Sequence, residues 1–193
     1  MYIAQMYCYG KDPTAVGVDG ISGCMGVFVD FADMLYAIHI VAGSKQANQT
    51  GADQFCDYVM GEAPSFDGKN ARIIFAINQF NRVGYMDEVR YIGKKLGIPK
   101  VEIVHVTAVE KDATGADKIA VLCERHGGKT LVLKYQSDGN VAWETGGEQR
   151  AGFYHPGGKA YGTAKKTSGA VSQGWTVIAA DNSIQKTSVV MLA

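Results

Sequence analysis

Two β-rich segments with almost no chain between them constrain this sequence more than any other feature. Residues 26–31 (GVFVDF) and 34–41 (MLYAIHIV) are rich in β-branched and aromatic residues, which is typical of strands. Because the connection is so short, the two strands are predicted to form an antiparallel hairpin, centred on Phe31 and Ala32.

The arms of this hairpin have equal length, and Cys24 then lies directly across from His39. Residues directly opposite each other on an antiparallel pair point to the same face, with Cβ atoms roughly 4.5–5.5 Å apart. A slip of one residue would put the two side chains on opposite faces, so the prediction is sharp. The same register pairs Phe28 with Leu35 and Asp30 with Asp33.

A thiol opposite an imidazole is the arrangement that thiol catalysis requires. A free cysteine has a pKa of about 8.5 and is mostly protonated at neutral pH. The imidazole of His39 would accept the proton of Cys24 and stabilise the thiolate. Ser22 and Gly23 precede the thiol; Gly23 permits a tight turn, and the backbone N–H of Cys24 could then stabilise an oxyanion.

The rest of the sequence predicts two helices packed on a β core. Thr50 resembles a helix N-cap with Asp53 three residues further on, and Gly61 and Pro64 end this helix. A second helix is expected over residues 85–96.

The strands predict a single α+β domain over residues 1–193, with a mostly antiparallel, sandwich-like core and about two flanking helices. Gly-rich residues 146–174 are expected to form a long surface loop, and residues 137–140 a turn. Besides the hairpin, strands are expected at 1–10, 71–77, 101–108, 119–125, 130–135, 141–143, 175–180 and 188–192.

Composition excludes several classes of function. Nineteen basic and nineteen acidic residues balance, so nothing suggests a nucleic-acid partner. We expect no membrane span, no signal peptide and no cofactor. The four cysteines lack the spacing of a zinc site or a disulfide framework, and no third ligand near Cys24 and His39 suggests a metal. Reduced thiols indicate a cytoplasmic setting, or delivery into the cytosol of a target cell.

The segment Ile21-Ser22-Gly23-Cys24, followed by His39 on the next strand, resembles the catalytic motif of glutamine-deamidating toxins. These are the cytotoxic necrotizing factors and the Burkholderia lethal factor, whose motif reads Leu-Ser-Gly-Cys. The chemoreceptor glutamine deamidases share their fold and a Cys–His pair. The resemblance covers about twenty residues. It implies hydrolysis of a glutamine side-chain amide in a target protein, for example a host GTPase or a translation factor.

This chain departs from the family at one position. The chemoreceptor enzymes and the Burkholderia factor have a catalytic threonine six residues before the cysteine, where this chain has Val18. The group that orients His39 is therefore open among Thr14, Asn78, Gln79 and a backbone carbonyl. Two other functions remain open: a different cysteine acyl-transfer hydrolase, such as a peptidase or small amidase, and a non-enzymatic binding module with a structural Cys24.

Overall fold

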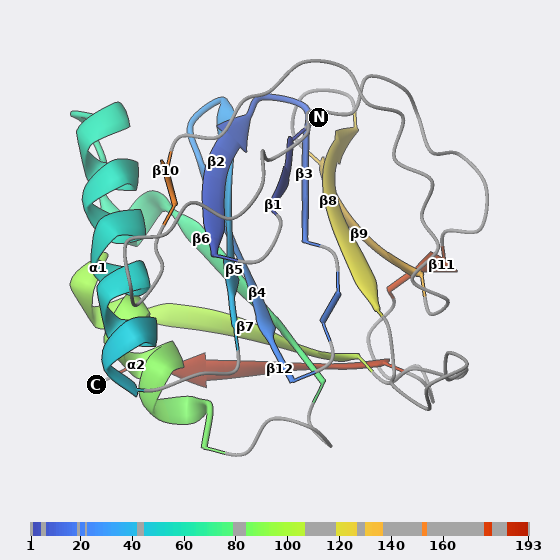
Figure 1. Cartoon of the computed structure of the whole chain (residues 1–193). Coiled ribbons are helices and arrows are strands. Elements are labelled where there is room, and N and C mark those ends of the chain that lie inside the picture. The colour runs from blue at the N-terminus through green and yellow to red at the C-terminus, as the bar shows by residue number, and fades with distance from the viewer. Residues whose placement is uncertain are drawn as a thin grey trace.

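The computed structural model describes residues 2–4, 7–18, 20–21, 23–41, 45–78, 84–106, 119–126, 130–136, 152–153, 176–178 and 185–192 (Figure 1). The helices are α1 (Lys45–Glu62), α2 (Met86–Lys95) and the short 3-10 helix η1 (Gly68–Asn70). The strands are β1 (Tyr2–Ala4), β2 (Cys8–Asp12), β3 (Ala15–Val18), β4 (Met25–Phe31), β5 (Met34–Ile40), β6 (Arg72–Ile77), β7 (Lys100–Val106), β8 (Ala120–His126), β9 (Thr130–Gln136), β10 (Gly152–Phe153), β11 (Thr176–Val177) and β12 (Gln185–Met191).

The strands form two sheets. The larger has the order β10-β2-β5-β4-β6-β7-β12, and the smaller has the order β1-β3-β8-β9-β11. Only β1 with β3 and β6 with β7 pair in parallel; the other described pairs are antiparallel. The β4–β5 hairpin lies at the centre of the larger sheet, so both of its edges are paired.

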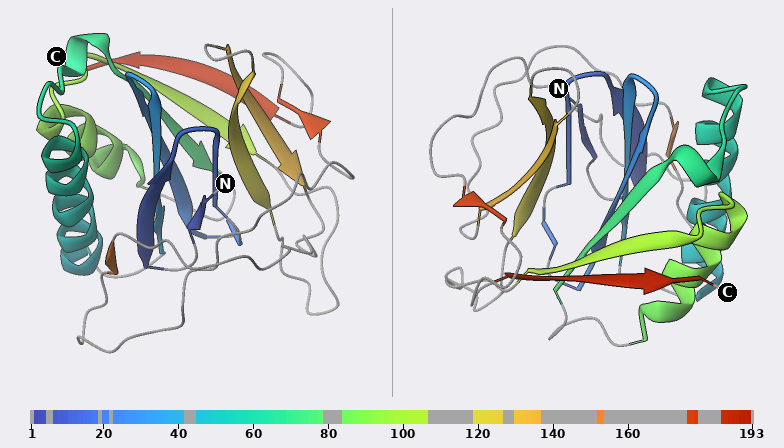
Figure 2. Two further views of the ribbon diagram at one scale, coloured as in Figure 1. Left: turned by 90° about the horizontal axis from the view of Figure 1, so that it is seen from above. Right: turned by 180° about the vertical axis from the view of Figure 1, so that it is seen from behind.

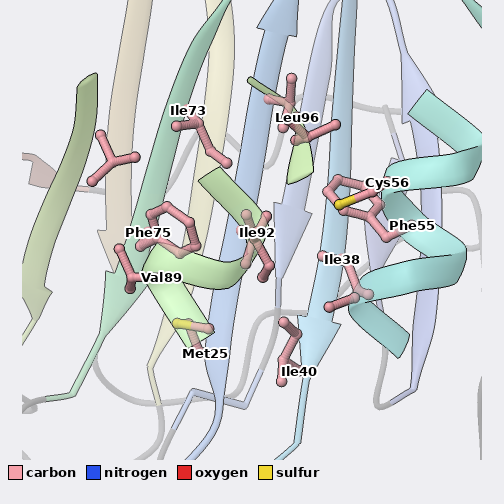
Figure 3. Close-up of a cluster of buried hydrophobic side chains, with 14 of the residues drawn as sticks. Met25, Ile38, Ile40, Phe55, Cys56, Ile73, Phe75, Val89, Ile92 and Leu96 are labelled. Carbon is pink, nitrogen blue, oxygen red and sulfur yellow. The ribbon is translucent and has the colours of Figure 1, made fainter. Parts of the chain in front are cut away.

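Both long helices cover one face of the larger sheet, and the smaller sheet lies on the other side (Figure 2). The core on the helix side contains Met25, Ile38 and Phe75 from the strands, together with Phe55 of α1 and Ile92 of α2 (Figure 3). Because side chains alternate along a strand, the neighbouring residues of β4, β5 and β6 point the other way. That second core lies between the two sheets and includes Phe28, Leu35, Ala37, Ile74 and Ala76 of the larger sheet.

The predicted α+β domain with a mostly antiparallel, sandwich-like core and two helices is confirmed. The predicted start of the first helix at Thr50 is wrong, because α1 begins at Lys45. Asn48 occupies a buried position one turn before Ala52, and its side-chain amide donates to Glu88 Oε1 of α2 at 2.6 Å. A polar residue therefore holds a buried position in the first half of the helix, where an apolar pattern does not reveal it.

Two other sequence predictions need correction. Residues 146–174 are not loop throughout, because β10 inside this range pairs with the edge strand β2. The single strand expected over residues 1–10 is divided into β1 and β2, which belong to different sheets. Tyr7, directly before β2, has a φ of +64°, which no continuous strand contains. The turn expected at 137–140 and the strand at 141–143 lie outside the described residues.

Candidate active site

The register of the central hairpin differs by two residues from the predicted one. His39 pairs with Gly26, Phe28 with Ala37, and Asp30 with Leu35. The predicted direct pairing of Cys24 with His39 is therefore wrong, as are those of Phe28 with Leu35 and Asp30 with Asp33. The cause is the turn: its central residues are Ala32 and Asp33, not Phe31 and Ala32. Moving a turn by one residue moves the register by two.

A register shift of two keeps Cys24 and His39 on the same face of the sheet. Side chains alternate with a period of two, so residues two apart on one strand share a face. Cys24 comes two residues before Gly26, which makes it the diagonal neighbour of His39. Diagonal neighbours lie about 7–8 Å apart, with somewhat closer Cβ atoms, and a ring can reach across such a distance. The face that they share is the one between the two sheets.

Gly20, between β3 and β4, lies close to His39. A Cβ atom built on Gly20 would lie 4.0 Å from His39 Cε1, and Gly20 itself has a φ of +74°. His39 is 1% exposed and Cys24 is 9% exposed, so the imidazole is enclosed while the thiol residue lies nearer the surface. Gly23, directly before Cys24, is half-buried. This arrangement suits a nucleophile that meets a substrate and a base that is shielded from water.

Asn78 lies beside Cys24 on the side away from His39. Met25 of β4 pairs with Ile77 of β6, and continuing that register by one residue places Cys24 across from Asn78. Asn78 is fully buried. The three side chains therefore follow one another across strands β5, β4 and β6, with the thiol in the middle.

Cys8 is a neighbour of His39 that sequence reasoning missed. Tyr9 pairs with Ile38, and continuing this register places Cys8 across from His39 on the inner face. Cys8 is fully buried. Two thiols therefore flank one imidazole; Cys8 begins β2 and is fully buried, whereas Cys24 directly precedes β4 and is 9% exposed. The pairing of β2 with β5 carries no signal in the sequence that would have revealed this.

The structure does not bring Thr14 to the pair. Its hydroxyl donates to Asp12 Oδ1 at 2.7 Å, and its carbonyl oxygen accepts the backbone N–H of Arg125 at 2.9 Å. Thr14 comes four residues before Val18, or about 13 Å along an extended chain. Val18, not Thr14, lies next to Gly26 and therefore near His39. Ser22 and Gln79 lie outside the described residues.

The remaining cysteines differ chemically from what a nucleophile needs. Burial raises the pKa of Cys56, on α1, to about 12. Burial likewise raises the pKa of Cys123, on β8, to about 12. Both thiols therefore stay protonated near neutral pH. None of the four cysteines forms a disulfide, and no group of three potential metal ligands occurs in the described ranges.

No protein-family model matches the chain, and no curated protein matches it. Within the part of the chain that the structure describes, neither long helix has the length and apolar character needed to cross a membrane.

Proposed function

We propose that this protein is a cysteine-dependent protein-glutamine deamidase. The observation that supports it is the placement of Cys24 and His39 as diagonal neighbours on one buried face, with the thiol residue directly before strand β4. We infer that the substrate is a glutamine side chain from the resemblance of residues 21–24 to the deamidase motif. As in that family, the partner would be a target protein such as a GTPase or translation factor, and this protein a bacterial toxin or effector acting in the cytosol.

The reaction divides into two steps. In the first, His39 takes the thiol proton, and Cys24 Sγ attacks the amide carbon of the substrate glutamine. The carbon–nitrogen bond breaks as His39 returns the proton, which leaves a thioester and free ammonia. In the second, His39 takes a proton from water as the water attacks the thioester. The carbon–sulfur bond breaks, the thiol is restored, and the product is glutamate.

The two cysteines beside His39 offer a matched test of this proposal. The protein is incubated with cell lysate, and ammonia release and Gln-to-Glu conversion are measured by an enzymatic assay and peptide mass spectrometry. Cys24→Ala should abolish both, whereas Cys8→Ala should retain activity. His39→Ala removes the acid–base group and should lower the rate by about 10²–10⁴-fold. Loss of activity in Cys8→Ala but not in Cys24→Ala would show that the nucleophile has been misassigned.

The same experiment separates the alternative functions. A cysteine peptidase or small amidase would use the same pair, but a peptidase would leave cleaved backbones in the lysate proteins. An amidase acting on small molecules would release ammonia without converting protein glutamine. A binding module would show neither reaction, and its Cys24 would be alkylated no faster than Cys56 or Cys123.

A further inference from the structure

We propose that the side-chain amide of Asn78 donates a hydrogen bond to the oxyanion that forms when Cys24 attacks an acyl carbon. This inference rests on the proposed thiol mechanism and assigns Asn78 a catalytic role. It replaces the sequence-based hypothesis that Asn78 orients His39.

The position of Asn78 favours the thiol over the imidazole. In the register of β4 with β6, Asn78 lies directly across from Cys24, and Cβ atoms of such pairs are roughly 4.5–5.5 Å apart. His39 is on β5, on the far side of β4. Neighbouring strands are about 4.8 Å apart, so β5 and β6 are separated by roughly 10 Å. Because His39 pairs with Gly26, it is also offset by two residues along the strands, so Asn78 lies closer to the thiol residue than to the imidazole.

The chemistry of an amide group fits this position. During attack, the sulfur–carbon bond forms and the carbonyl electron pair moves onto oxygen. A donor fixed beside the sulfur stabilises that charge before the bond to the leaving group breaks. Asn78 is fully buried, and Ala76, two residues earlier on the same face, belongs to the apolar core between the sheets, so a neutral donor avoids the cost of burying an ammonium or guanidinium group. The backbone N–H of Cys24 is the natural second donor.

Two reagents that differ in mechanism test the assignment on the full chain. Acylation of Cys24 by p-nitrophenyl acetate passes through a tetrahedral oxyanion and releases p-nitrophenolate. Alkylation by iodoacetamide is a displacement at a saturated carbon and forms no oxyanion. Both rates are measured for the wild type and for Asn78→Ala, and the rate of a Cys24→Ser protein is subtracted as background.

We expect Asn78→Ala to lower the acylation rate by about 10²–10³-fold, as loss of an oxyanion donor does in other enzymes, and to leave alkylation of Cys24 unchanged. Asn48→Ala is the matched control, because it removes a buried amide from α1, away from the thiol; both of its rates should equal those of the wild type. Equal loss of both rates in folded Asn78→Ala, or no loss of acylation, would overturn the assignment.

Asn78→Leu guards against misfolding, because it removes the donor, keeps nearly the same shape and buries no charge. Alkylation of Cys56 and Cys123, which are buried in the native protein, reports any unfolding of either variant. Failure of the Asn78 assignment can also be distinguished from failure of the proposed deamidase activity. If the wild type converts no glutamine, deamidation fails, while the ratio of the two reagent rates still decides the role of Asn78.

Discussion

Gly26 sets how closely the chain before Cys24 can approach His39. A Cβ atom at this position would lie 3.2 Å from Val18 Cβ and from Ile21 Cδ1, which is closer than ordinary van der Waals contact. Gly26 is also the residue that pairs with His39. Because Gly26 has no side chain, residues 18 and 21 can pack against strand β4. Gly20, which lies between them in the chain, is then close to the imidazole of His39.

We expect Gly26→Ala to lower the alkylation rate of Cys24 and to destabilise the protein by about 1–3 kcal/mol, the usual cost of overpacking a core. Val18 Cβ is next to the backbone and cannot rotate away, so β3 has to shift. Gly61→Ala is the control, since a Cβ atom there meets nothing within 4 Å on α1 and should stabilise the helix by about 0.5–1 kcal/mol. Chemical denaturation and timed alkylation measure the two effects, and an unchanged Cys24 rate in a destabilised Gly26→Ala would refute the role of this contact.

Thiol selectivity is a second property of individual residues. At neutral pH, iodoacetamide should modify Cys24 well before Cys56 and Cys123, because burial raises the pKa of both latter thiols to about 12 and leaves almost no thiolate. Peptide mass spectrometry of the native protein over time gives the order of modification. In denaturant, all sites should react at similar rates. Simultaneous modification in the native state would remove the basis for every enzyme hypothesis.

The turn of the central hairpin carries a strained residue. Ala32 has a φ of +53°, in the left-handed region that costs an L-residue roughly 1–2 kcal/mol. Glycine removes this strain but adds about 0.5–1 kcal/mol of unfolded-state entropy. Ala32→Gly should therefore raise the free energy of unfolding by up to about 1 kcal/mol. Ala71→Gly, at an ordinary φ of −96°, should lower it, and urea denaturation compares the two. A loss in both variants would show that Ala32 is unstrained.

The same turn explains why the sequence predicted the face that Cys24 and His39 share but not the register of their strands. Alternation of polar and apolar residues fixes which face a side chain occupies, so Cys24 and His39 were placed on one face correctly. Two registers that differ by two residues satisfy that pattern equally, and only the conformation of Ala32 and Asp33 distinguishes them. The sequence therefore predicted the shared face but not the diagonal geometry.

Neighbours from other strands were harder to predict, because they depend on long-range pairing. Asn78 was one of several candidates for orienting His39, and nothing local in the sequence shows that β6 lies beside β4 and not beside β5. Cys8 was missed for the same reason. The helices were predicted more easily, except where Asn48 placed a polar side chain on the buried face of α1.

The two sheets are joined by charged groups at the end of the sandwich away from Cys24. Arg125 of β8 forms an ion pair with Asp30 of β4, and it lies 3.8 Å from Asp33. On the same sheet as Asp30, Arg72 pairs with Glu102 at 2.6 Å. Asp30 lies six residues along the chain from Cys24, or about 20 Å. Ion pairs therefore connect the two sheets at one end of the sandwich, and the candidate active site lies at the other end.

Replacing Arg125 should separate stability from activity. Arg125→Met removes the ion-pair partner of Asp30, and breaking a buried pair in this way costs about 3–5 kcal/mol, with less expected here because Asp30 is partly exposed and Arg72 still acts on it. Burial already raises the pKa of Asp30 in spite of Arg125, and loss of the guanidinium should raise it further.

A carboxyl whose pKa is higher in the folded state than in the unfolded state favours folding at low pH. That contribution is lost as pH rises through the folded-state pKa. The stability deficit of Arg125→Met should therefore be small under acid conditions and grow as pH rises above the ordinary range of aspartate. Urea denaturation across pH measures it, and Asp30→Asn/Arg125→Met, which removes both charges, should flatten the profile. The alkylation rate of Cys24 should remain that of the wild type in each folded variant; a fall in that rate would mean that the ion pair and the site are coupled through the sandwich.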